Sequence, residues 1–135
     1  MQDILIPISP GELLDKISIL RIKARRMGDA VKLANVQREL ELLEATWQQT
    51  AASSGLGEAA GELAAQLTAL ESVNAALWDI EDRIRECEAR ERFDAEFITL
   101  ARSVYQRNDE RAGIKKRINL LLGSAIVEEK SYQPY

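Results

Sequence analysis

Apolar residues recur at spacings of three and four over most of this chain, and that period is typical of α-helices. The longest run consists of Leu63, Leu67, Leu70, Val73, Leu77, Ile80, Ile84 and Cys87. Its length predicts a helix over residues 58–91 that packs through a coiled-coil-like seam. Aromatic residues make up only 5% of the chain, which argues against a fold of many short strands. An all-α fold of long helices is therefore expected.

Local signals mark where the helices begin. Ser9 is a suitable N-cap, Pro10 suits the first helical position, and Glu12 is spaced to complete a capping box. Asp29 and Asp94 are expected to cap later helices in the same way. We expect a single domain over 1–135, an antiparallel bundle with an extended arm (1–9), four helices (10–27, 30–51, 58–91 and 95–122) and a short tail (124–135).

The first helix carries apolar residues outside its main stripe, namely Leu14, Ile19 and Ile22. A helix that is apolar on more than one side is either central in its bundle or covered by a second chain. Both arrangements stay open, and the second predicts a homodimer with its contact at the first or third helix. Within the first hairpin, Leu20 and Leu40 are expected to be fully buried.

The apolar pattern of the last helix changes partway along its length. Ile98 and Tyr105 lie on one face, whereas Ile114 and Ile118 lie nearly opposite at about 100° per residue. Either the helix breaks or kinks near Asn108, or one long helix packs against two partners.

Charge and composition exclude several classes of function. The net charge is −4 and no long Lys/Arg run is present, so a nucleic-acid-binding surface is not expected. No stretch approaches the roughly 20 apolar residues of a membrane span. His is absent and Cys87 is the one cysteine, so we expect no metal site, no cofactor and no catalytic residue. Cys87 itself is expected to be a small buried apolar residue.

One segment of the last helix gathers side chains suited to holding an anion. They are Arg102, Tyr105, Asn108, Asp109, Arg111 and Lys115. Their spacing places them on neighbouring stripes, and Arg can bind an anion through paired N–H donors. The alternative interpretation is a solvated helix face, and both stay open.

Four stretches resemble a family of small bacterial proteins of unknown function. They are Ile6–Leu20 (IPISPGELLDKISIL), Leu77–Arg85, Phe93–Ile118 and Gly123–Tyr132 (GSAIVEEKSY). The resemblance covers most of the chain except the region 50–70. It implies a bacterial, cytoplasmic protein and supplies no catalytic residue.

Together these features favour a small cytoplasmic interaction or scaffold protein over an enzyme, with a second copy or another protein as partner. The alternative is a helical-bundle enzyme or a binder of a small anionic ligand. It would be similar in general plan to the chorismate mutase bundles, which hold a dicarboxylate with Arg and Lys. Comparable residue types here are Arg21, Arg102, Arg111 and Lys115. If they are buried and face one another they favour the binder, and if exposed they favour the scaffold.

Overall fold

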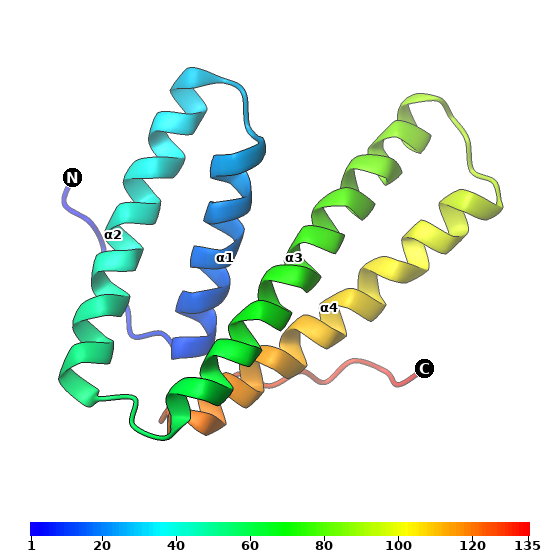
Figure 1. Ribbon diagram of the computed structural model, residues 1–135. Helices are drawn as coiled ribbons and strands as arrows, with labels where there is room; N and C mark the ends of the chain where they lie inside the picture. Colours follow the sequence, from blue (N-terminus) through cyan, green and yellow to red (C-terminus); the bar gives the residue numbers. More distant parts are fainter.

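The computed structural model describes all 135 residues and contains four α-helices and no strand. The helices are α1 (Pro10–Arg26), α2 (Ala30–Ser54), α3 (Ala59–Ala89) and α4 (Ala95–Leu121). They form two antiparallel hairpins, α1–α2 and α3–α4, which meet at one end and splay apart at the other (Figure 1). The expected all-α bundle is therefore confirmed. None of the helices has the length and apolar character needed to cross a membrane.

Side-chain caps begin three of the helices, as the sequence predicts. Ser9 Oγ accepts the backbone N–H of Glu12 at 3.2 Å, and Asp29 and Asp94 cap α2 and α4 in the same manner. The capping box of α1 is only half formed. The Glu12 carboxylate accepts a hydrogen bond from Lys115 on α4 instead of from the backbone of Ser9.

Two helix ends differ from the expected positions by more than one residue. α2 continues past residue 51 to Ser54, and within this last part Thr50 and Ser53 donate their hydroxyls to carbonyls one turn back. Gly55, with φ of 68°, ends it. α3 ends at Ala89, two residues before the expected position, and Glu91 turns the chain in the left-handed region with φ of 51°.

α1 is the central helix of the bundle. It contacts α2, α3 and α4, whereas α2 contacts α1 alone. Leu14 and Ile22 are only 3% and 1% exposed, so these two residues are covered within the chain, whereas Ile19 is partly exposed. The core cluster joins α1, α3 and α4 and consists of Leu13, Leu14, Ile17, Leu63, Leu70, Val73, Ile114 and Ile118. Burying each such side chain stabilises the fold by about 1.5–3 kcal/mol.

α2 is peripheral. Val36 is its only buried residue. Leu20 of α1 is buried as expected, but the prediction that Leu40 is fully buried is wrong, because it is half-buried. A helix that packs on one neighbour covers only part of each side chain at the contact.

α4 is one continuous helix that packs on α3 and on α1. The residue that α4 buries near its start is Leu100, whereas Ile98 is 56% exposed. The inward stripe therefore runs from Leu100 through Asn108 and Arg111 to Ile114, at spacings close to the helical period. Of the two alternatives, one long helix that packs against two partners is confirmed. The expected change of face is wrong, because Ile98 and Tyr105 are exposed and polar residues occupy the middle of a single inward stripe.

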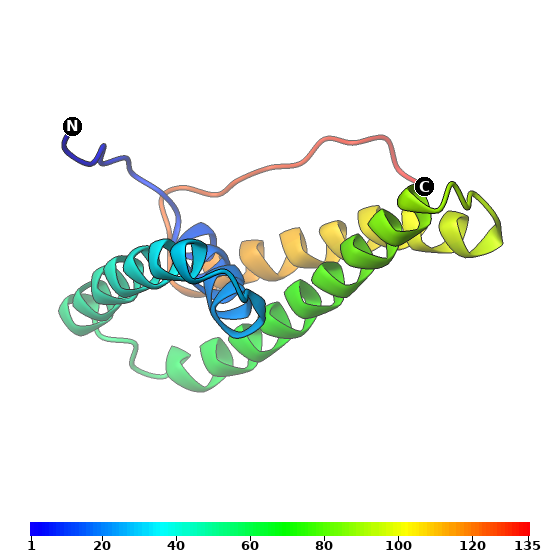
Figure 2. The ribbon, with the colours of Figure 1, turned by 90° about the horizontal axis from the view of Figure 1, so that it is seen from above.

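The arm and the tail lie outside the bundle. Ile4 and Leu5 of the arm are 80% and 91% exposed. The tail runs back along α4 (Figure 2), where Lys130 lies 3.6 Å from Asp109 and the hydroxyl of Tyr135 donates to Asp109 at 2.7 Å.

Candidate functional site

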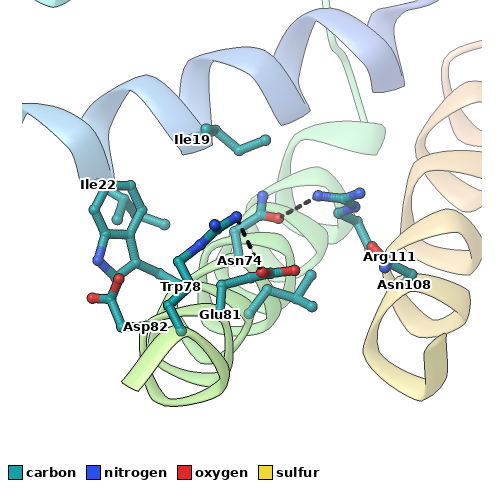
Figure 3. A pocket seen from close by; sticks show the side chains of 10 residues that line it. Ile19, Ile22, Asn74, Trp78, Glu81, Asp82, Asn108 and Arg111 are labelled. Atoms are coloured by element: carbon teal, nitrogen blue, oxygen red, sulfur yellow. Dashed lines mark hydrogen bonds and ion pairs between the residues drawn. The ribbon is translucent and has the colours of Figure 1, made fainter. Parts of the chain in front are cut away.

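A groove with a volume of about 450 Å³ opens where α1 separates from the α3–α4 hairpin (Figure 3). Ile19 and Ile22 of α1 form one wall, and Asn108 and Arg111 of α4 lie opposite. The floor is one face of α3, between Asn74 and Arg85. This volume is within the range of sites that bind small molecules.

The groove exists because the helices differ in length. α1 has 17 residues and α3 has 31, which at 1.5 Å per residue makes α3 longer by about 20 Å. α1 therefore ends partway along α3 and leaves the next turns of α3 uncovered. On those turns Trp78, Glu81 and Arg85 follow one another at helical spacing, so they share the uncovered face, whereas Asn74, one turn earlier on the same face, is buried against α1.

A buried polar network lies at the inner end of the groove. Nδ2 of Asn74 donates to Oδ1 of Asp15 at 2.8 Å and to Oγ of Ser18 at 3.2 Å. Oδ1 of Asn74 accepts a hydrogen bond from Arg111 at 3.4 Å. Asn74, Asp15 and Ser18 are all buried, and buried polar groups are costly unless they are hydrogen-bonded. The network fixes the amide of Asn74, and through it the guanidinium of Arg111.

Lys115 continues this network on the side away from the groove lining. Its Nζ donates to Glu12, lies 3.4 Å from Asp15 and lies 3.9 Å from Glu128 of the tail. Burial opposes the charged forms of Lys115 and Glu12, but their hydrogen bond and mutual attraction outweigh it. The pKa of Glu12 is lowered and the pKa of Lys115 is raised. Both stay charged and neutralise each other.

The charges that line the groove are balanced. Arg85 lies 3.7 Å from Glu81, one turn away on α3. Arg111 and Asp82 also line the groove, and neither forms an ion pair within the chain. Trp78 supplies an aromatic surface beside them (Figure 3). The groove therefore offers hydrogen-bond donors, acceptors and an apolar wall.

The structure distributes the six residues of the expected anion site over several places. Asn108 and Arg111 line the groove. Lys115 is held by carboxylates, and Arg102 is exposed and forms no ion pair. Arg21, considered beside them, pairs with a glutamate of α2 at 2.7 Å. Arg21 and Arg102 therefore do not converge with the others.

Tyr105 and Asp109 contact the tail. The rings of Tyr105 and Tyr135 pack edge to face with centroids 5.1 Å apart, and Asp109 accepts the Tyr135 hydroxyl. A second groove of about 500 Å³ brings four of the six predicted residues together with the tail. It is lined by Val104, Tyr105, Asn108, Asp109, Arg111, Lys130 and Tyr132.

Sequence reasoning missed the network behind the groove. Gly11, Asp15, Ser18 and Ile22 recur at spacings of four, three and four and are all buried. These residues follow the helical period, but most of them are polar or small. A pattern of apolar residues alone therefore does not include them. Asn74 of α3 is missed for the same reason.

Comparison with known proteins places the chain in a family. No curated protein and no solved structure matches it. A family model matches residues 4–135, a region that contains the four helices, the groove and the tail. By this match the chain belongs to the Family of unknown function (DUF6165).

Proposed function

We propose that the protein binds a small molecule with an anionic group in the groove between α1, α3 and α4. The observation that supports this proposal is the state of Arg111. Its side chain is half-buried, it has no carboxylate partner, and Asn74 holds its guanidinium at the inner end of the groove. A guanidinium held in this way presents its remaining N–H donors in a fixed plane, which matches a carboxylate or a phosphate.

The buried network supports binding because it fixes the direction of the Asn74 amide. Asn74 donates to the Asp15 carboxylate at 2.8 Å and to the Ser18 hydroxyl at 3.2 Å, which leaves its carbonyl oxygen directed at Arg111. A ligand site requires this, because its donors must be in place before the ligand arrives.

A thermal-shift screen of phosphorylated sugars and dicarboxylates tests the proposal. We expect at least one compound to raise the Tm, and Arg111→Lys to weaken its binding about 10-fold or more, because lysine lacks the planar fork. The matched control is Arg107→Lys, on the same helix, where the arginine is exposed and pairs with Glu110. The proposal fails if no compound shifts the Tm, or if both variants bind like the wild type.

The exposed apolar arm supports a second function, an interaction module that pairs with a second copy of the chain. Ile4, Leu5 and Ile6 are 80%, 91% and 69% exposed, and only 20 of the 135 residues are buried. Contiguous apolar surface of this kind is typical of protein contacts. Of the residues that favoured a contact through the first helix, Leu14 and Ile22 are covered by the chain itself and Ile19 lines the groove, so we propose that the contact is at the arm.

Sedimentation at micromolar concentration tests this second function. We expect a species of twice the 15.1 kDa chain mass, which Leu5→Asp returns to the single-chain mass while Val31→Asp, on the exposed face of α2, does not. A wild-type protein that sediments only at the single-chain mass argues against the homodimer. Binding to a different protein is then the interaction that remains to be tested. The cytoplasmic location and bacterial origin stay predictions from the resemblance.

A further inference from the structure

We infer that the ligand of the groove is a zwitterion, with its anionic group at Arg111 and a protonated amine at Asp82. This inference rests on the proposed function, since it names the class of molecule that the same groove takes. It follows from the charges that remain unpaired.

Two of the four charged side chains in the groove form an ion pair with each other. Arg85 and Glu81 lie one turn apart on α3, 3.7 Å from one another. Both side chains are exposed to solvent, so the pair is weak, but each charge has a partner of opposite sign beside it. Arg111 is left without an anionic partner and Asp82 without a cationic one. The groove thus presents one free charge of each sign, on two different helices.

The two free charges lie at opposite ends of the groove (Figure 3). Arg111 lies at the end formed by α4, and Asp82 lies next to Trp78 at the other end. The space between them has Ile19 above it and Glu81, paired with Arg85, below it. A ligand with only a negative charge satisfies Arg111 but meets an uncompensated carboxylate further along. A ligand with an anion at one end, an ammonium at the other and an apolar body between them complements all three features.

The two ends contribute unequally. Arg111 is half-buried and braced by Asn74, so losing its paired donors weakens binding strongly. Asp82 is exposed, and solvent-exposed ion pairs change an affinity by only about 2- to 5-fold. Asp82 therefore acts mainly in selectivity, favouring a zwitterion over the corresponding anion by that factor.

The experiment uses the full chain and probes that differ only in charge. The first set is 6-aminohexanoate, hexanoate and hexylammonium, titrated while backbone amide shifts are followed by NMR. Shorter and longer ω-amino acids vary the distance between the two charged groups of the ligand. Aminoalkyl phosphonates of the same lengths test whether Arg111 prefers a phosphonate to a carboxylate. We expect the best zwitterion to bind about 2- to 5-fold more tightly than its singly charged anionic analogue. The cation alone should bind most weakly.

Two variants locate the effect. Asp82→Asn should remove the preference for the zwitterion without weakening the anionic analogue. Glu88→Gln, an exposed α3 carboxylate in no ion pair, makes the same change in net charge and should keep the preference. Arg111→Lys should weaken the zwitterion and the anion alike.

The outcomes separate the inference from the function on which it rests. Equal binding of the zwitterion and the anion by the wild type overturns the zwitterion and leaves anion binding at Arg111 in place. Loss of the preference in Glu88→Gln as well as in Asp82→Asn also overturns it, because overall charge then explains the effect. If no probe binds, or Arg111→Lys changes nothing, the proposed function itself fails.

Discussion

The backbone N–H of Gly11 donates a 2.7 Å hydrogen bond to Oδ1 of Asn119, and this contact joins the first turn of α1 to the last turn of α4. Both residues are buried. A Cβ at position 11 would lie 2.5 Å from the carbonyl oxygen of Lys115 and 2.8 Å from Oδ1 of Asn119. The close approach of the two helices therefore depends on glycine at this position.

Replacing Gly11 with alanine should lower the free energy of unfolding by about 1–3 kcal/mol, because the new methyl group meets backbone that cannot give way. The measurement is urea denaturation. Gly113→Ala is the matched control, since Gly113 is inside α4 and a Cβ there meets nothing within 4 Å. That substitution should raise the free energy of unfolding by about 0.5–1 kcal/mol, because alanine has a higher helix propensity than glycine. If both substitutions changed the free energy of unfolding equally, α1 and α4 would not approach each other closely at Gly11.

The ion pair of Glu12 and Lys115 should make the free energy of unfolding depend on pH in the acidic range. The unfolded chain protonates Glu12 near its ordinary pKa of 4.5, whereas in the folded chain its pKa is lowered by Lys115 despite the opposing effect of burial. The contribution of Glu12 is therefore complete above about pH 4.5 and is lost as the pH falls through the lowered value.

Urea unfolding of the wild type and Glu12→Gln at pH 7 and pH 3 tests this dependence. The difference in stability between them should be larger at pH 7 than at pH 3. Glu39→Gln, on the exposed surface of α2 and in no ion pair, is the control and should differ from the wild type equally at both pH values. A pH-independent difference for Glu12→Gln would contradict the assignment.

Three truncations to alanine should rank by burial. Leu20→Ala should lower the free energy of unfolding by about 2–5 kcal/mol, because less apolar surface is buried and a cavity remains in the core. Leu40→Ala should cost about 1 kcal/mol, because the side chain is half-buried and solvent can fill the space. Arg26→Ala should cost less than about 0.5 kcal/mol, although Arg26 pairs with Asp79 on the surface. Midpoints in urea give the order, and equal values for Leu20 and Leu40 would contradict the peripheral position of α2.

The thiol of Cys87 should react only when the α3–α4 hairpin opens. Cys87 is 6% exposed on the face of α3 that meets α4. A thiol reagent should therefore label the native protein slowly, and labelling should accelerate through the urea transition. Labelling of the native protein at the rate of a free thiol would show that this end of the hairpin is open.

Sequence patterns predict those parts of the fold that depend on neighbours in the chain. Ser9 and Asp94 cap their helices because a cap needs only the residue three positions ahead. The apolar seam of α3 is similarly local, and Leu63, Leu70 and Val73 are buried as their spacing predicts. The outcome for Leu40 differs, since its exposure depends on how many helices α2 touches, which no local pattern contains.

The groove could be predicted only in part. Asn108 and Arg111 lie on the segment that the sequence singled out, but Asn74, the partner of Arg111, is 37 positions away from it along the chain. Which residues line the groove depends on where α1 ends along α3, and that is a relation between two helices. The sequence around Asp82 does not predict a role for it, because its place in the groove depends on residues of other helices.

Because α1 is shorter than α3, the two ends of the α3–α4 hairpin should differ in local stability. Beyond the groove, the outer turns of α3 and α4 bury apolar surface only against each other, while the turns near Gly11 share three-helix packing. Opening should therefore begin at the outer tip of the hairpin and stop near Asn74, so amide protection should fall steadily between those points. The groove lies on this boundary. A molecule that bridges Arg111 and Asp82 would tie the less stable half to the more stable one, and amide exchange in the outer turns would then slow when the site is occupied.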